Sequence, residues 1–434
     1  MVLYLLIASA ALAKAGAMPF HSWIPTASEG APTSVMAYLP ASMDKLMGIY
    51  FLFFASYNLF AISTAIKMTL MIIGVITLII AVLMAMVQHD WRRLLSYCAV
   101  SQVGYMVLGI GTGTAIGILG GMFHMINHAM YKSSLFLCAG AVERETGITE
   151  LEKLGGLGKK MPVLFFANIV AAFAISGVIP LNGFISKWLV YRGCLDAGQP
   201  IMFILAIFGS GLTLASFIKV LHSVYMGPLP PELQNVKSPG FSLVFPPLVL
   251  SLLCIIFGIL PIIPLGKLLV PTLSSSISSI MATLPSGYEF DVFSIKLGSS
   301  YWNVGLAVLL MFLGVVIAWL YYAMGKAFKT RKARAFVGGI KPGTLAGYHT
   351  FTNEAMRVPG TGFYNTIAEL PIFRSILPSA KEGLFDPYEY LNRIGNAIFV
   401  KPLKLLHNGI LSSYLSWAII GLVVVFIVLI QGYL

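Results

Sequence analysis

Residues 117–142 read GILGGMFHMINHAMYKSSLFLCAGAV, and this stretch decides the fold class. It is apolar enough to lie in a bilayer, yet it carries His124, His128 and Lys132 at positions i, i+4 and i+8, which share one helix face. Ionisable side chains at membrane depth cost roughly 2.5–3.5 kcal/mol each on insertion scales, and they usually face a bundle interior or a water-filled path. The stripe therefore indicates a proton route; hydrogen bonding between helices and snorkelling to a helix end are the alternatives.

The composition is that of a polytopic membrane protein. Of the 434 residues, 58% are hydrophobic and 10% are charged, whereas soluble domains carry about 25% charged residues. Most of the net charge of +12 lies in loops between apolar runs, which argues against nucleic acid as a partner. The two histidines have no third zinc ligand nearby. The sequence thus predicts no metal and no cofactor, and four scattered cysteines form no CxxC pair: Cys98, Cys138, Cys194 and Cys254.

Apolar runs predict an all-α protein with about ten transmembrane helices. Most runs reach the ~20 residues that a spanning helix needs. They lie at 1–14, 34–56, 63–87, 94–112, 115–141, 161–190, 201–226, 241–262, 301–325 and 411–432. Helix breaks are predicted at Pro19, Pro40, Pro180 and Gly183. Backbone groups freed at membrane depth are tolerated only beside protein or a wet cavity, and broken helices next to buried charge are typical of transporters.

Basic residues in the loops predict the orientation. Arg92 and Arg93, the lysines of 142–160 and the basic start of 326–410 fall on one predicted side, whereas opposite loops such as 57–62 are nearly uncharged. The positive-inside rule makes loops 88–93, 142–160 and 326–410 cytoplasmic and the C-terminus external. We expect 263–300 to lie along the outer interface, and the amphipathic stretch 388–406 to lie on the membrane or along neighbouring helices.

Ionisable residues in the first two apolar runs extend the predicted path. Lys14 closes the first run; a buried lysine can alternate between charged and neutral forms, and an interfacial lysine that reaches water is the alternative. Asp44 and Lys45 lie well inside the second run. Because adjacent helical residues diverge by about 100°, these two are expected to face different neighbours, one of them the path. A structural ion pair with another helix is the alternative.

Later spans carry further candidates. Lys187 follows the break at Pro180, beside Ser186, as suits a proton acceptor at the end of a path; an interfacial lysine is the alternative. Lys219 and His222 share a helix face in the next span. Lys219 is expected to link the histidine stripe to Lys187.

Four motifs carry a resemblance to a known family: KAGAMPFHSWIPTASEGAPTSVMAYL (14–39), DWRRLLSYCAVSQVGYMVLGIG (90–111), HMINHAMYKSSLFLCAGAV (124–142) and IPLNGFISKWLVYRG (179–193). In this order they resemble the antiporter-like subunits shared by respiratory complex I, Mrp-type cation/proton antiporters and membrane-bound energy-converting hydrogenases. The similarity covers roughly residues 1–260. Residues 300–434 resemble the hydrogenase and formate-hydrogenlyase branch.

The resemblance implies inverted five-helix repeats around a central polar axis. Lys14 would be the central lysine of the first broken helix, Lys45 the bridging lysine, and Lys187 the terminal lysine of the second broken helix, with the 117–142 stripe in the middle. The implied domains are 1–60, part of the first half-channel; 61–262, a second half-channel repeat; 263–325, an outer segment and extra span; and 326–434, a cytoplasmic amphipathic segment and final span.

The function implied by the resemblance is translocation of protons, with sodium coupling as an option, by a non-redox subunit of a redox-driven multi-subunit complex in the cytoplasmic membrane. Family members carry further helices before the Lys14 motif. Another chain is therefore expected to supply those helices, or an acidic partner for Lys14. The alternatives are a structural scaffold with an inactive polar axis and a component of an Mrp-type Na⁺/H⁺ antiporter.

Overall fold

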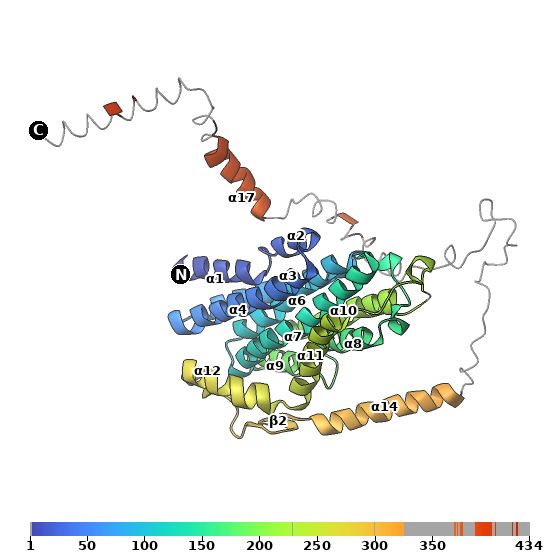
Figure 1. The fold of residues 1–434 in the computed structure, drawn as a ribbon. Coiled ribbons are helices and arrows are strands. Elements are labelled where there is room, and N and C mark those ends of the chain that lie inside the picture. Colours follow the sequence, from blue (N-terminus) through green and yellow to red (C-terminus); the bar gives the residue numbers. More distant parts are fainter. Residues whose placement is uncertain are drawn as a thin grey trace, which may run out of the picture. The chain divides into compact units, whose positions relative to one another are not determined.

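The computed structural model describes residues 2–227, 229–298, 300–324 and 387–401, together with a few single residues beyond them. The chain divides into two units, Met1–Arg374 and Ser375–Leu434, which are described separately. The first unit is a bundle of apolar helices (Figure 1). The all-α membrane fold predicted from the sequence is confirmed in this bundle.

The N-terminal helices form two connected layers. Helix α1 (Val2–Ala15) ends at a non-helical turn and is followed by α2 (Trp23–Gly30), so Pro19 lies in the gap between them. Helix α3 (Thr33–Tyr38) then continues through the π-helical segment η1 (Leu39–Met43), α4 (Asp44–Phe54) and η2 (Ala55–Leu59). Pro40 lies in η1 and does not break this run. Its widened turn accommodates a residue without a backbone donor, so the break expected here is a local widening.

Three long helices follow: α5 (Thr64–Met86), α6 (Trp91–Gly111) and α7 (Ala115–Thr146). The last two form the buried centre of the bundle, whereas α5 has one exposed face. Glycines let α5 and α6 approach closely, since a Cβ on Gly104 would lie 2.5 Å from the carbonyl oxygen of Gly74. In Figure 1, α7 runs through the middle of the bundle, and most of its residues are buried.

The second broken helix consists of α8 (Pro162–Ser176) and α9 (Asn182–Asp196). Pro180 lies between them, whereas Gly183 belongs to the first turn of α9. Helices α10 (Pro200–Tyr225) and α11 (Phe241–Ile259) complete the bundle. Short 3₁₀ turns occupy the loops: η3 (Leu151–Lys153), η4 (Leu157–Lys159) and η5 (Pro231–Leu233).

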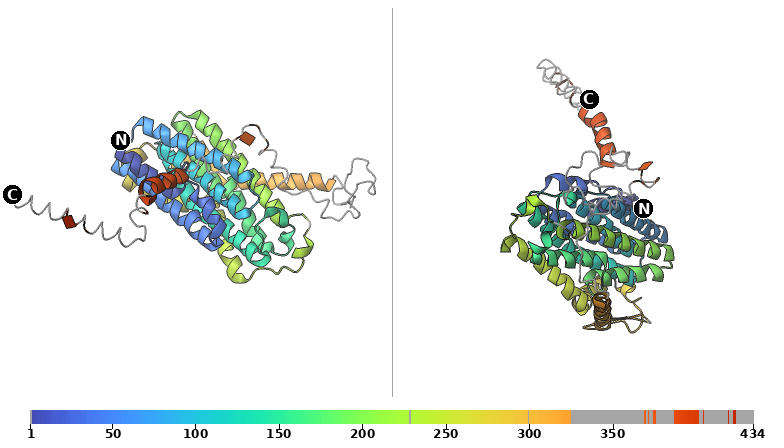
Figure 2. Two further views of the ribbon diagram at one scale, coloured as in Figure 1. Left: turned by 90° about the horizontal axis from the view of Figure 1, so that it is seen from above. Right: turned by 90° about the vertical axis from the view of Figure 1, so that its right-hand side faces the viewer.

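The segment after α11 contains structure that the apolar pattern did not predict. The π-helical segment η6 (Ile262–Leu269), α12 (Val270–Ser276) and α13 (Ser278–Met281) are followed by a small antiparallel sheet. Its strands β1 (Glu289–Phe290), β2 (Ser294–Leu297) and β3 (Ser300–Asn303) pair in that order. The sheet leads into α14 (Val304–Met324), which extends away from the bundle in Figures 1 and 2.

Among the described residues, five helices are long and apolar enough to cross a membrane, namely α5, α6, α10, α11 and α14. Each overlaps a predicted span, and shorter apolar helices, among them α1 and α8, overlap others. The predicted last span, 411–432, lies outside the described residues apart from three single positions. In the second unit, α17 (Pro387–Gly395) and the π-helical segment η9 (Asn396–Val400) coincide with the stretch predicted to be amphipathic.

Candidate proton path

Helix α7 holds the three ionisable residues of the predicted stripe inside the bundle. His124, His128 and Lys132 each have no solvent-exposed surface. The helix begins at an N-cap where the Thr114 hydroxyl accepts from the amide of Gly117 at 3.1 Å. With its 32 residues, α7 carries the stripe through the centre of the bundle, between α6 and α9.

His124 is the best-bonded member of the stripe. Its Nδ1 lies 2.9 Å from the hydroxyl of Ser186 on α9, and its Nε2 lies 3.2 Å from the Gln102 side-chain oxygen on α6. The Tyr131 hydroxyl is also 3.2 Å from Nε2. The imidazole therefore bridges three helix segments, and both of its nitrogens lie on hydrogen-bonded connections along which a proton can move.

The other end of the stripe faces Lys45. The Lys45 ammonium lies 5.8 Å from the centre of the Trp23 ring. The charges of Lys45 and Lys132 both act on His128, whose ring packs edge-on against Tyr131 at 5.6 Å. Lys45, His128 and Lys132 thus form one group of ionisable side chains contributed by α4 and α7.

Aromatic rings surround the remaining lysines. The Lys132 ammonium lies between Phe136 and Phe217, 5.8 and 5.6 Å from the ring centres. The Lys187 ammonium lies 4.5 Å from the centre of the Tyr105 ring. Such cation–π contacts offset only part of the cost of removing a charge from water.

Three lysines of this group have no hydrogen-bond partner. Within the described part of the chain, none of the ammonium groups of Lys45, Lys132 and Lys187 is paired, although all three are buried. Buried polar groups are normally satisfied, and those that are not usually have a functional reason. We call Lys45, His128, Lys132, His124 and Lys187 the buried axis.

The two broken helices are built alike around the ends of this axis. Gly16 and Gly177 both adopt left-handed backbone, with φ of 78° and 83°, and each precedes a cis proline peptide. A Cβ on Gly16 would lie 2.1 Å from the Ile24 side chain and 3.8 Å from the Lys45 ammonium, and one on Gly177 would lie 3.0 Å from the Lys187 side chain. The second break thus leaves room for Lys187 where a side chain would otherwise stand, and the first leaves room for Ile24 next to Lys45.

Two asparagines fasten the second break to α7. The amide of Asn127 donates to the backbone oxygen of Asn182 at 3.0 Å, and the amide of Asn182 donates to the side-chain oxygen of Asn127 at 2.9 Å. Both residues are fully buried. This reciprocal pair fixes the start of α9, and hence Ser186 and Lys187, relative to the stripe.

Lys14 lies apart from the buried axis. Its ammonium pairs with the Asp44 carboxylate at 2.6 Å, and 49% of its side chain is exposed. An acidic partner was expected on another chain, but this chain supplies one itself. Asp44 and the buried Lys45 face different surroundings because neighbouring helical positions diverge.

Lys219 is buried, but its ammonium points to the end of α5. It donates to the backbone oxygens of Met86 and Gln88 at 2.7 and 2.6 Å. A cation at a helix C-terminus satisfies carbonyl groups that have no partner within the helix. Lys219 was predicted to link the stripe to Lys187, but its two hydrogen bonds go to the backbone of Met86 and Gln88.

Neutral side chains complete the site. Gln102, Tyr131 and Asn127 were not singled out from the sequence, because neutral polar residues are common in membrane helices. Their one sequence signal is position: Asn127 and Tyr131 lie within the stripe itself.

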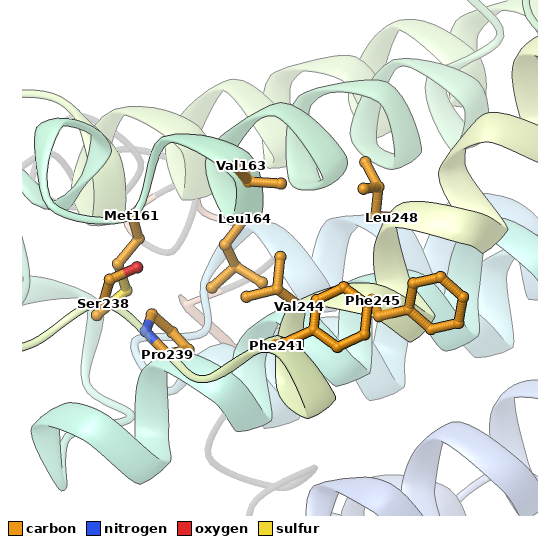
Figure 3. Close-up of a pocket in the computed structure, with 9 residues that line it drawn as sticks. All are labelled: Met161, Val163, Leu164, Ser238, Pro239, Phe241, Val244, Phe245 and Leu248. Atoms are coloured by element: carbon orange, nitrogen blue, oxygen red, sulfur yellow. The ribbon is translucent and has the colours of Figure 1, made fainter.

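The described residues contain no candidate metal site, and their apolar cavity lies away from the buried axis. Among the described residues, no three His, Cys, Asp or Glu side chains come together as a metal site would require. A cavity of about 350 Å³ opens between the first turns of α8 and α11. Figure 3 shows that apolar side chains such as Leu164, Val244 and Phe245 line it. None of the axis residues lines this cavity.

A membrane bundle with two broken helices around buried lysines and histidines defines an antiporter-like membrane subunit. Residues 1–213, about half of the chain, match the family described as "NADH:quinone oxidoreductase/Mrp antiporter, TM". The family predicted from the sequence motifs is thereby confirmed.

Relatives come from both branches of the family. The chain is 33% identical over 229 residues to "NADH-quinone oxidoreductase subunit N" of Desulforudis audaxviator, covering 52% of this chain and 46% of that protein. It is 33% identical over 314 residues to "Na(+)/H(+) antiporter subunit A1" of Staphylococcus aureus, covering 67% and 38%. The chain thus spans about half or less of the length of these relatives.

A solved structure shares the fold over most of the chain. It is a chain of the membrane-bound sulfane sulfur reductase, an archaeal respiratory membrane complex. The TM-score is 0.74 at 24% identity, and the match covers 98% of this chain and 68% of that one. The similarity extends the fold assignment beyond the region matched by the family.

Proposed function

We propose that this chain is the proton-translocating subunit of a redox-driven, multi-subunit membrane complex. The observation that carries the proposal is the buried axis, in which three lysines have no hydrogen-bond partner among the described residues. A purely structural site would pair such groups, because an unpaired buried charge is strongly destabilising. A translocating site needs groups that are free to gain and lose a proton.

Electrostatic repulsion between neighbouring cations of the buried axis would couple proton uptake to proton release. Lys45, His128 and Lys132 act electrostatically on one another in a low-dielectric interior, so protonation of one disfavours protonation of the next. A proton that enters at one end therefore promotes release at the other. Partner subunits would bias this equilibrium through the half-exposed Lys14, which lies at the end of α1 ahead of the first break and pairs with Asp44 of α4.

Lys132 offers the decisive test. Lys132→Ala removes the group, whereas Lys132→Arg keeps a cation that hardly releases its proton. Both variants should abolish proton uptake per electron in vesicles while the complex assembles and its redox partner turns over. Lys153→Gln, a charge removal in an exposed loop, serves as control.

The scaffold alternative predicts another pattern. Arginine at position 132 would then rescue what alanine breaks, because a cation and its donors are preserved. Coupling in the Lys132→Ala variant equal to that of the wild type would end the proton-path proposal for this stripe.

The similarity to an Na⁺/H⁺ antiporter subunit favours a second candidate, a component of an Mrp-type antiporter. Sodium-dependent proton exchange in vesicles without any electron donor would support it. Strict dependence of transport on electron flow would support the redox-driven complex. Purification of the native complex, with identification of its co-eluting chains, separates the two independently.

The domain boundaries and the orientation belong to the same proposal. We propose that 1–60 forms part of one half-channel and 61–262 a second, with 263–325 on the outer side. Loops 88–93, 142–160 and 326–410 are cytoplasmic in this proposal. A cysteine introduced at position 331 should then react with an impermeant reagent from the cytoplasmic side, and one at 434 from outside; the reverse labelling would overturn the orientation.

A further inference from the structure

One end of the bundle carries a rigid frame built from two loops. The amide of Trp91 donates to the Thr149 oxygen, and the amide of Leu151 donates to the His89 oxygen, both at 2.9 Å. Asp90 forms a backbone bridge with Glu150 and also caps α6, accepting from the amide of Arg93 at 2.9 Å. Residues 88–91 and 149–152 are therefore fixed side by side.

A titratable pair lies on this frame in contact with solvent. His89 Nδ1 is 2.8 Å from the Glu152 carboxylate, and 50% and 43% of the two side chains are exposed. The neighbouring charges have other partners: Lys153 pairs with Glu150 at 2.6 Å, and Arg92 with Glu143 at 3.2 Å. The frame thus presents one imidazole–carboxylate pair that can exchange protons with water.

Lys219 binds the backbone next to this pair. Its two carbonyl partners, Met86 and Gln88, lie within three residues before His89 in the chain. Glu152 acts electrostatically on Lys219, although Lys219 is only 2% exposed. Lys219 is therefore a buried ionisable group within electrostatic reach of the surface pair.

The two carbonyl bonds suit a lysine that titrates in place. A neutral amine has two N–H groups and an ammonium has three. Donation to Met86 and Gln88 uses two of them, so the nitrogen stays anchored in both charge states. A change of charge on this nitrogen therefore does not require the loss of either bond.

Lys219 also approaches the buried axis. Phe217, two residues earlier on α10, contacts the Lys132 ammonium. The buried Cys98 of α6 lies within electrostatic reach of Lys132, Lys187 and Lys219 together. Cys98 is thus the common neighbour of Lys219 and of two axis lysines.

We propose that His89, Glu152 and Lys219 form a proton port that joins the buried axis to the membrane face bearing Arg92 and Arg93. The port rests on the proposed translocating function. Water gives a proton to the His89–Glu152 pair, the pair passes it to the neutral Lys219 amine, and the resulting ammonium passes it toward Lys132. Each donor returns to its starting form, so one proton crosses the port per cycle; the reverse sequence releases one.

The alternative is that Lys219 only caps α5. Lys219→Arg distinguishes the two roles because arginine keeps the cation and the donors to both carbonyls but does not exchange its proton. A cap role predicts wild-type transport in Lys219→Arg. The port predicts that Lys219→Arg and Lys219→Met both slow proton uptake by roughly 10²-fold, as for loss of a positioned proton donor.

The test uses the assembled complex in everted vesicles, with the proposed cytoplasmic face outward. The double variant His89→Ala, Glu152→Gln should slow proton uptake per electron, and external imidazole should restore it by replacing the lost surface group. Lys153→Gln on the same loop should not change uptake. Wild-type uptake in the double variant, failure of imidazole to restore it, or wild-type uptake in Lys219→Arg would each overturn the port.

Measuring Lys132→Ala in the same membranes distinguishes refutation of the proton port from refutation of the proposed translocating function. If Lys132→Ala abolishes uptake while the port variants pump normally, the axis translocates protons and the port lies elsewhere. If Lys132→Ala itself pumps normally, the proposed function fails first.

Discussion

Replacing Lys132 by methionine should make the protein more stable while it abolishes transport. Lys132 is fully buried, its ammonium has no hydrogen-bond partner among the described residues, and two phenylalanine rings flank it. Methionine has nearly the same length and volume and needs no partner. Functional groups that are destabilising in this way are expected where activity is selected over stability.

The structure sets the size of the gain. An unpaired buried polar group costs about 1–3 kcal/mol. The two cation–π contacts, at 5.6 and 5.8 Å, lie near the outer limit for this interaction and return about 0.5 kcal/mol each. The net expectation for Lys132→Met is a stabilisation of about 1 kcal/mol.

Thermal unfolding in detergent, followed with a thiol-reactive fluorogenic dye, measures this change. The four cysteines are free and buried, so they react only as the protein opens. Leu135→Ala, at a buried apolar position on the same helix, is the matched control and should cost about 2–5 kcal/mol. A loss of stability in Lys132→Met comparable to that of Leu135→Ala would show that Lys132 has a structural partner, and would refute the reasoning.

Three further outcomes are expected in the same unfolding assay. Asn182→Ala should lower stability by about 1–3 kcal/mol, because the side-chain oxygen of Asn127 loses its donor, the Asn182 amide, inside the bundle; an unchanged transition would contradict the reciprocal pair. Gly193→Leu should prevent folding, since a Cβ there would lie 2.3 Å from the Gly117 backbone, whereas Gly211→Leu, with open space around it, should be neutral. Asp44→Asn should change stability by less than about 1 kcal/mol, because its partner Lys14 is half exposed; a loss several times larger would place the pair in a dry interface.

The sequence predicted the axis because ionisable residues stand out in apolar runs. The stripe at His124, His128 and Lys132 needed only helical spacing and the cost of burial, and the structure buries all three. Lys45 and Lys187 were found for the same reason. The position of Lys187 beside the second break required only the proline and glycine signals that precede it, whereas Lys14, and not Lys45, was predicted beside the first break.

What the sequence did not predict depends on contacts between helices. The direction of Lys219 is set by where α5 ends, and the partner of Lys14 is set by how α1 packs on α4; neither is local information. The break expected at Pro40 became a π-helical turn because helical structure on both sides continues through it. The strands at 289–303 are too short to give an alternating pattern that a scan for apolar spans detects.

The position of Cys98 has a spectroscopic consequence. Its thiol is buried on α6 and feels the charges of Lys132, Lys187 and Lys219 at once. An S–H stretching vibration shifts with the local electric field and absorbs where water and the rest of the protein absorb little. The native chain therefore contains a label-free infrared reporter at the junction of the port and the axis, whose frequency should step each time one of these three amines changes its charge.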